Sequence, residues 1–267
     1  APTGIYTLSL HDALPIFEGG TLHVGSGGIT RDATAPYLVE YGGAGGVVRA
    51  TATFTSPLDA TLSGTGGNAI TFDTAEETIT LSGALGGAGG LNKTGIGMLK
   101  LTGANNYAGA TAVSNGTLEA DGAYTGGGLI TVHDGATLAG TGSVAAVTVA
   151  DNGTVAPGTS AGTLTVGGDL TLAGTSVLDY ELDAPDPVGG VGGDFVTGIQ
   201  GLTLDGVLNV TSLGFDFLTA SVGDQWKLMS YSGTLTDNTL SLGSMPGLDG
   251  GKSYTITVTG EIGRAHV

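Results

Sequence analysis

Short stretches in which apolar and polar residues alternate recur along the chain. Residues 78–81 (Thr-Ile-Thr-Leu) and 163–166 (Thr-Leu-Thr-Val) place an aliphatic side chain at every second position. Because successive side chains of a strand point to opposite faces, this period predicts short β-strands with one buried side. No stretch repeats apolar residues at helical spacing between capping residues. The pattern therefore predicts an all-β protein.

A short unit built on Gly and Thr-Leu also recurs. Its glycines at 116, 135 and 153 are 19 and 18 residues apart, and each follows an Asn or Asp. Such dipeptides form tight corners with positive φ, and taken singly they would also suggest hairpins. The repeated spacing favours one coil of a parallel β-helix, in which stacked coils supply the core. An antiparallel meander is the alternative.

Both ends of the chain resemble translated sequencing adapters. Residues 7–16 read TLSLHDALPI and residues 261–267 read EIGRAHV. We predict that 1–16 and 261–267 are non-native, which removes His11 and His266 from the candidate residues. The remainder is predicted to divide near Pro157 into a β-solenoid, 17–157, and a C-terminal β-rich solenoid or capping region, 158–260.

The amino-acid composition and net charge exclude several classes of protein and of binding partner. The chain has 267 residues with 52 Gly, no Cys, 7 basic and 24 acidic residues, and a formal charge of −17. The glycines follow no three-residue period, which excludes collagen. An acidic surface is unsuited to nucleic acid, which is bound mainly through Lys and Arg. No run of about 18 apolar residues predicts a transmembrane helix, so membrane contact is expected only through an anchor or barrel outside this chain.

Residues 89–109, together with 111–120, carry a family resemblance. They read GGLNKTGIGMLKLTGANNYAG and TAVSNGTLEA, and they resemble the autotransporter-associated β-strand repeat, also called the passenger-associated transport repeat. Met98 and Ala110 depart from that pattern. We place the core of the repeat at 88–122. The resemblance implies a right-handed parallel β-helix (β-solenoid) in a secreted or surface-displayed passenger of a Gram-negative bacterium, without catalytic residues.

Two carboxylate pairs could suggest a different class. Glu76 with Glu77, and Asp183 with Asp186, are candidates for the chemistry of a β-helical polysaccharide lyase or glycoside hydrolase. Such an enzyme needs its carboxylates to converge in a groove, and a lyase also needs a basic residue beside them. The basic residues of this chain are scattered in sequence. We interpret both pairs as solvated turn charges and keep the enzyme as the alternative.

One segment fits a calcium-binding pattern. Residues 189–197 match the nonapeptide GGxGxDxUx. Calcium in such coils needs oxygens from successive repeats, and no second copy is present. We therefore interpret this segment as a glycine-rich corner that leads into a strand and not as a calcium site.

Other candidate chemistry is sparse. His23 and His133 are 110 residues apart, without Cys or an HExxH pattern, so we predict exposed strand histidines and no zinc site. The glycine run at 42–46 precedes no helix and does not suggest a phosphate loop. Trp226, Tyr231 and Tyr254 are predicted to pack within the C-terminal unit.

The sequence thus predicts a structural or adhesive passenger segment that is not an enzyme. We assign no catalytic, cofactor-binding or metal residues and expect no cofactor. Candidate partners are cell-surface glycans, host or matrix proteins, or further copies of the chain, and nucleic acid is excluded. The predicted location is extracellular or at the outer-membrane surface of a Gram-negative cell.

Overall fold

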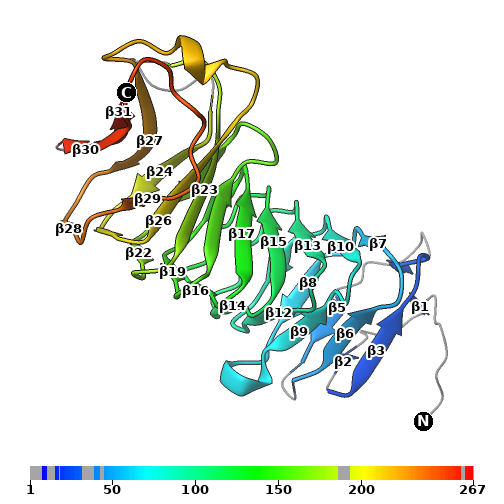
Figure 1. Ribbon diagram of the computed structural model, residues 1–267. Coiled ribbons are helices and arrows are strands. Elements are labelled where there is room, and N and C mark those ends of the chain that lie inside the picture. The colour runs from blue at the N-terminus through cyan, green and yellow to red at the C-terminus, as the bar shows by residue number, and fades with distance from the viewer. Residues whose placement is uncertain are drawn as a thin grey trace.

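A computed structural model describes residues 8–10, 16–17, 19–31, 39–42, 45–185, 193–259 and 262–266. Within them it contains β-strands and two short 3-10 turns, η1 (Gly66–Asn68) and η2 (Phe217–Thr219). Figure 1 shows the strands stacked side by side in an elongated body, with early and late coils at opposite ends. The all-β prediction is confirmed.

Two long parallel sheets run through the body. The ten-stranded sheet has the order β28 (Leu235–Asp237), β25 (Leu202–Leu204), β22 (Leu170–Leu172), β19 (Val147–Val149), β16 (Ile130–Val132), β14 (Thr111–Val113), β12 (Leu91–Thr94), β9 (Ile70–Asp73), β6 (Val47–Ala50) and β3 (Thr21–Val24). The nine-stranded sheet has the order β29 (Ser241–Leu242), β26 (Val207–Ser212), β23 (Val177–Leu182), β20 (Thr154–Pro157), β17 (Ala136–Gly140), β15 (Gly116–Ala120), β13 (Met98–Leu101), β10 (Thr78–Leu81) and β7 (Phe54–Ser56).

A third face completes each coil and is less regular. Early coils contribute a four-stranded sheet, β11 (Leu85–Gly86), β8 (Ala60–Leu62), β5 (Val39–Tyr41) and β2 (Ile16–Phe17). Late coils contribute a six-stranded sheet, β18 (Ser143–Val144), β21 (Thr163–Val166), β24 (Phe195–Ile199), β27 (Gln225–Tyr231), β31 (Ile262–His266) and β30 (Thr255–Thr259). Between β11 and β18 the third face consists of turns joined by an isolated bridge between Asn105 and Tyr124.

Named strands in the described part of the chain pair in parallel, except where β31 pairs antiparallel with β27 and β30, and two isolated bridges, Gly140 with Gly158 and Leu182 with Gly193, are also antiparallel. This pattern confirms the parallel β-helix and shows that the meander alternative is wrong. The right-handed sense of the coils stays a prediction.

In-register apolar ladders form the core. On the inner side of the nine-stranded sheet, buried residues pair strand by strand: Phe54, Ile79, Leu99, Leu118, Leu138, Val155, Leu178 and Leu208. Each fully buried Leu or Ile contributes about 1.5–3 kcal/mol by leaving water. The alternation predicted for residues 78–81 and 163–166 is confirmed, with the aliphatic positions buried.

The coils lengthen toward the C-terminal end. Hydrogen-bonded partners on neighbouring coils are 20 residues apart at Leu85 and Asn105, and 33 apart at Thr197 and Ser230. The longer coils enclose an aromatic cluster in which Trp226 stacks on Phe217 at 5.1 Å between ring centroids. Tyr254 lies against the same Phe217 ring, and Tyr231 is buried. The predicted packing role of the three C-terminal aromatics is confirmed.

The predicted domain boundary and the two predicted non-native ends contain strands that pair with the rest of the chain. β20, which ends at Pro157, pairs with β17 before it and β23 after it. At the ends, β1 (Leu8–Leu10) pairs with β4 (Ile29–Arg31), and β31 lies between β27 and β30. The division near Pro157 and the non-native origin of both ends stay predictions.

Candidate functional site

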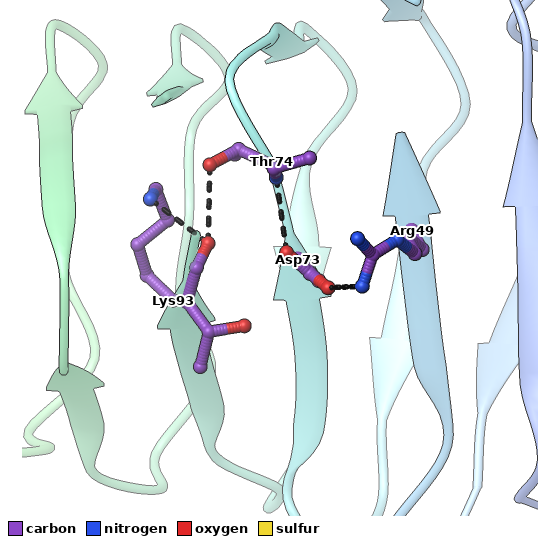
Figure 2. Close-up of polar contacts among 6 residues, drawn as sticks. Arg49, Asp73, Thr74 and Lys93 are labelled. Atoms are coloured by element: carbon purple, nitrogen blue, oxygen red, sulfur yellow. Dashed lines mark hydrogen bonds and ion pairs between the residues drawn. The ribbon is translucent and has the colours of Figure 1, made fainter. Parts of the chain in front are cut away.

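One corner of the stack holds a buried lysine. Lys93 occupies an inward position on β12, between Phe72 on β9 and Val113 on β14, and none of it is exposed. Its ammonium group donates hydrogen bonds to three backbone carbonyls, those of Thr94 at 3.0 Å, Gly95 at 2.7 Å and Asn115 at 2.9 Å. Figure 2 shows this side chain curled back toward the end of its own strand. The lysine therefore ties two successive corners together.

Burial lowers the pKa of Lys93 to about 8, and the carboxylate of Asp73 acts in the opposite direction. A buried ammonium is tolerated only where hydrogen bonds replace its lost hydration. The three carbonyls supply those bonds. The lysine can therefore be buried only where these carbonyls are in place, and the carbonyls in turn rely on the lysine as their donor.

Further polar contacts extend this corner to earlier coils (Figure 2). Arg49 on β6 pairs with the Asp73 carboxylate at 2.6 Å. The other oxygen of Asp73 accepts from the backbone N–H of Ala75, whose φ is 50°. The Thr74 hydroxyl donates to the Thr94 carbonyl at 3.1 Å. Polar groups thus link consecutive coils at one edge of the ten-stranded sheet.

Two buried polar residues replace strand pairing on the third face. The side-chain oxygen of Asn105 accepts from the backbone N–H of Leu85 at 3.0 Å, and its amide nitrogen donates to the Gly103 carbonyl at 3.0 Å. The Tyr107 hydroxyl lies 2.7 Å from that of Thr111. Because a buried polar group without a partner is costly, these contacts explain how a strandless turn can pack inside the stack.

An ion cluster crosses the outer side of the nine-stranded sheet. The Lys100 ammonium contacts Glu119 on the next coil and Asp121 at 2.7 Å. These carboxylates hold the pKa of Lys100 above its ordinary value. Burial, reinforced by Asp121, keeps the pKa of Glu119 raised in spite of the lysine. The cluster joins two coils through charge.

A column of glycines lets the coils approach each other. A Cβ placed on Gly103 would lie 2.1 Å from the carbonyl oxygen of Gly83. A Cβ on Gly122 would lie 2.0 Å from the carbonyl oxygen of Gly103, and one on Gly142 would lie 2.2 Å from that of Gly122. Real Cβ atoms do not approach backbone that closely, so each of these corners requires glycine.

The segment that carries the buried Lys93, Asn105 and Tyr107 and the Lys100–Glu119 ion pair also matches a family model. Residues 91–120 match the passenger-associated-transport-repeat. The chain is 32% identical over 178 residues, 65% of its length, to the adhesin BmaC autotransporter of Brucella suis biovar 1 (strain 1330). These matches identify an autotransporter passenger repeat. The chain is also 44% identical over 82 residues, 31% of its length, to an extracellular serine protease of Serratia marcescens.

These alignments span only 5% of the adhesin and 8% of the protease. The passenger repeat itself comprises β12, β13, β14 and β15. The sequence pattern of the repeat now has a physical basis. Its aliphatic residues fill the inner ladders, Lys93 and Asn105 satisfy backbone groups at the turns, and the Tyr107 hydroxyl is bonded to that of Thr111.

The carboxylates singled out in the sequence do not converge. Glu77 lies in the turn before β10, where it accepts a hydrogen bond from Thr53 at 2.8 Å, and Glu76 beside it is exposed. The backbone carbonyl of Asp183 accepts from the Trp226 indole at 2.8 Å. Asp186 lies outside the described residues.

A different set of carboxylates does share a cleft. Asp179, Glu181 and Asp194 line a surface depression of about 220 Å³ together with Ser160 and Thr211. The residues that line it include no Lys, Arg or His, so the cleft lacks the basic group that the lyase alternative requires.

Asp194, within the calcium-like nonapeptide, makes structural contacts. It is 2% exposed, and its oxygens accept from the backbone N–H of Gly162 at 2.9 Å and of Glu181 at 2.7 Å. Residues 189–192 of the nonapeptide lie outside the described residues. Among those described, no three His, Asp or Glu side chains are grouped to hold a metal ion.

Asp194 gives stability a dependence on pH. Burial, opposed by its two backbone donors and aided by Glu181 and Asp179, raises its pKa from 3.8 to about 7. The folded state therefore holds a proton that the unfolded state has released between these values. We expect the free energy of unfolding to be larger at pH 4.5 and to fall by about 2–4 kcal/mol as the pH rises to 7.5.

Urea unfolding of the native chain and of Asp194→Asn at several pH values isolates this contribution. The variant lacks the ionising group, so the difference between the two chains should change with pH in the direction just given. A difference that stays constant from pH 4.5 to 7.5 would contradict the assignment.

The two central histidines do not form a catalytic or metal pair. His23 is half-buried on β3, next to Arg49 in register, and His133 is exposed after β16. The prediction of exposed strand histidines is thus right in part for each residue: His133 is exposed but lies outside the strand, and His23 lies on a strand but is half-buried. In the described part of the chain no helix is long and apolar enough to cross a membrane.

Sequence reasoning missed the buried lysine. The basic residues are scattered in the sequence and form no pattern of their own, yet Lys93 stands two positions after the buried Leu91 in an alternating strand. The period of two, applied strictly, would have placed its side chain inside.

Proposed function

We propose that this chain is a structural and adhesive segment of a secreted or surface-displayed passenger, without catalytic activity. The stack of parallel ladders passing through the passenger repeat carries the proposal. Solenoid coils contact only their neighbours and build a stiff, extended body with long solvent-facing sides. Such a body holds many weak contact points at fixed spacing, and multivalent engagement makes weak contacts effective.

The relatives support this role and this location. The aligned portion of one relative belongs to an autotransporter adhesin and covers 65% of the present chain. Both relatives are named as an autotransporter or an extracellular protein, which supports placement outside a Gram-negative cell. Surface glycans, host or matrix proteins and further copies of the chain are the proposed classes of partner.

Adhesion should depend on the intact stack. We expect beads coated with the purified chain to attach to epithelial cell layers or matrix-coated surfaces more than albumin-coated beads do. Beads carrying chain unfolded in urea and blocked against refolding should lose that attachment. The measurement is the number of beads retained under flow.

Two outcomes would contradict the proposal. One is attachment no greater than that of albumin beads although circular dichroism shows folded β-structure. The other is cleavage of casein by the purified chain that a serine-directed inhibitor abolishes, because it would place catalysis within this segment.

A further inference from the structure

The outer side of the ten-stranded sheet carries a column of uncharged polar residues. Residues at the same strand position pair in register from coil to coil: Thr71, Asn92, Ala112, Thr131, Thr148, Thr171, Thr203 and Thr236. In the described part of the chain, the side chains of Asn92, Thr131 and the threonines after it make no hydrogen bond to protein. Parallel strands place such groups about 4.8 Å apart.

The column contains one short side chain, and a groove lies there. Ala112 sits between Asn92 and Thr131, where the missing side-chain volume opens a depression of about 330 Å³. The turn that carries η1 contributes Thr65 and Ala69 to its lining, and Figure 1 shows this turn projecting beside β9. The groove thus has a floor on the passenger repeat and a wall from the preceding coil.

The lining of the groove combines neutral hydrogen-bonding groups with small apolar surface. Its polar side chains include Asn92, Thr131 and His133. Ala110, Ala112 and several glycines supply the rest. No Asp, Glu, Lys or Arg lines the groove, although the chain carries a net charge of −17.

We propose that this groove and the adjoining threonine column bind a neutral polysaccharide. Amide, hydroxyl and imidazole groups donate to and accept from sugar hydroxyls, and the alanine floor suits the C–H face of a sugar ring. The groove volume lies at the lower end of the range for small-ligand sites. A polymer is favoured over a single sugar because the free hydroxyls continue along the stack at regular spacing.

The charge of the chain favours a neutral polysaccharide over an anionic polymer or a second copy of the chain. An anionic polymer would meet a strongly acidic chain, and no Lys or Arg lines the groove to offset that charge. A second copy of the chain would bring the same excess of negative charge, and the uncharged groove offers nothing to offset it. The inference rests on the adhesive role proposed above and specifies the chemical class of its ligand.

The test is affinity electrophoresis of the full chain in gels that contain dextran, mannan or galactan, with polygalacturonate as the anionic comparison. We expect at least one neutral polymer to retard the chain and polygalacturonate to leave its mobility unchanged. Thr131→Val, which keeps the side-chain shape and removes the hydroxyl, should weaken retardation about threefold to tenfold. Ala112→Leu, which fills the floor, should abolish it.

Thr137→Val is the matched control, because it removes a hydroxyl from the outer side of β17 in the nine-stranded sheet, outside both the column and the groove. It should leave retardation within about twofold, and circular dichroism verifies that each variant is folded. Absence of retardation by all three neutral polymers, or equal loss in Thr131→Val and Thr137→Val, would overturn the inference. So would concentration-dependent sedimentation abolished by Ala112→Leu, which would make a second copy the occupant. Bead attachment that persists in Ala112→Leu, with no polymer binding, would overturn the glycan inference and leave the adhesive role standing.

Discussion

Gly128→Ala should lower the free energy of unfolding by about 2–4 kcal/mol, whereas Gly127→Ala should change it by less than about 1 kcal/mol. The two glycines are neighbours in one turn of the third face. A Cβ on Gly128 would lie 1.9 Å from the carbonyl oxygen of Gly109 on the preceding coil. A Cβ on Gly127 would have no atom within 4 Å.

The difference arises because the obstacle at Gly128 is backbone. A flexible side chain could rotate away from a new methyl group, but the Gly109 carbonyl is held within the stack, so neighbouring coils must separate. At Gly127 the methyl group points into open space, and alanine reduces the freedom of the unfolded chain.

Urea unfolding followed by far-ultraviolet circular dichroism measures both variants. Equal stabilities of the two would contradict the close-packing argument. A loss confined to Gly127→Ala would contradict the geometry of the turn itself.

Lys93→Met should cost about 2–3 kcal/mol at pH 7.5, whereas Arg49→Met should cost about 1 kcal/mol or less. Both substitutions remove one positive charge near Asp73. Lys93 is fully buried and serves three carbonyls, and methionine leaves those of Gly95 and Asn115 without this donor. Arg49 is 48% exposed in its ion pair, where water screens the attraction.

The pH dependence provides a second readout for the same lysine. Its folded pKa of about 8 lies below the ordinary 10.5, so the unfolded state binds more protons between these values. Stability contributed at this site therefore rises with pH, by about 1–2 kcal/mol from pH 7.5 to 9.5. The gap between native chain and Lys93→Met should widen over that range.

The range ends below pH 10 because buried tyrosines act with the opposite sign. Burial raises the pKa of Tyr41 and Tyr107, so unfolding is favoured once unfolded tyrosines begin to ionise. A gap between native chain and Lys93→Met that narrows from pH 7.5 to 9.5 would contradict the lysine assignment, and Arg49→Met should show no pH trend of its own.

The sequence alone determined the strand character of this protein and favoured the parallel β-helical class, whereas the parallel pairing that excludes a meander is seen only in the structure. Alternation at residues 78–81 and 163–166 fixes which side chains face inward, because a one-residue shift would expose every aliphatic group. The Asn-Gly and Asp-Gly corners also follow from local sterics: φ is 64° at Gly116, 71° at Gly135 and 57° at Asn152. These features depend only on a few neighbouring residues.

Only the tertiary structure decided which polar groups meet. Lys93 and the Asn115 carbonyl are 22 residues apart, and Asp194 bonds to Gly162 over 32 residues. The uncharged groove likewise joins the η1 turn to positions on β12, β14 and β16. Such contacts depend on coil length and register, which vary along this stack, and a period of two within each strand contains no information about either.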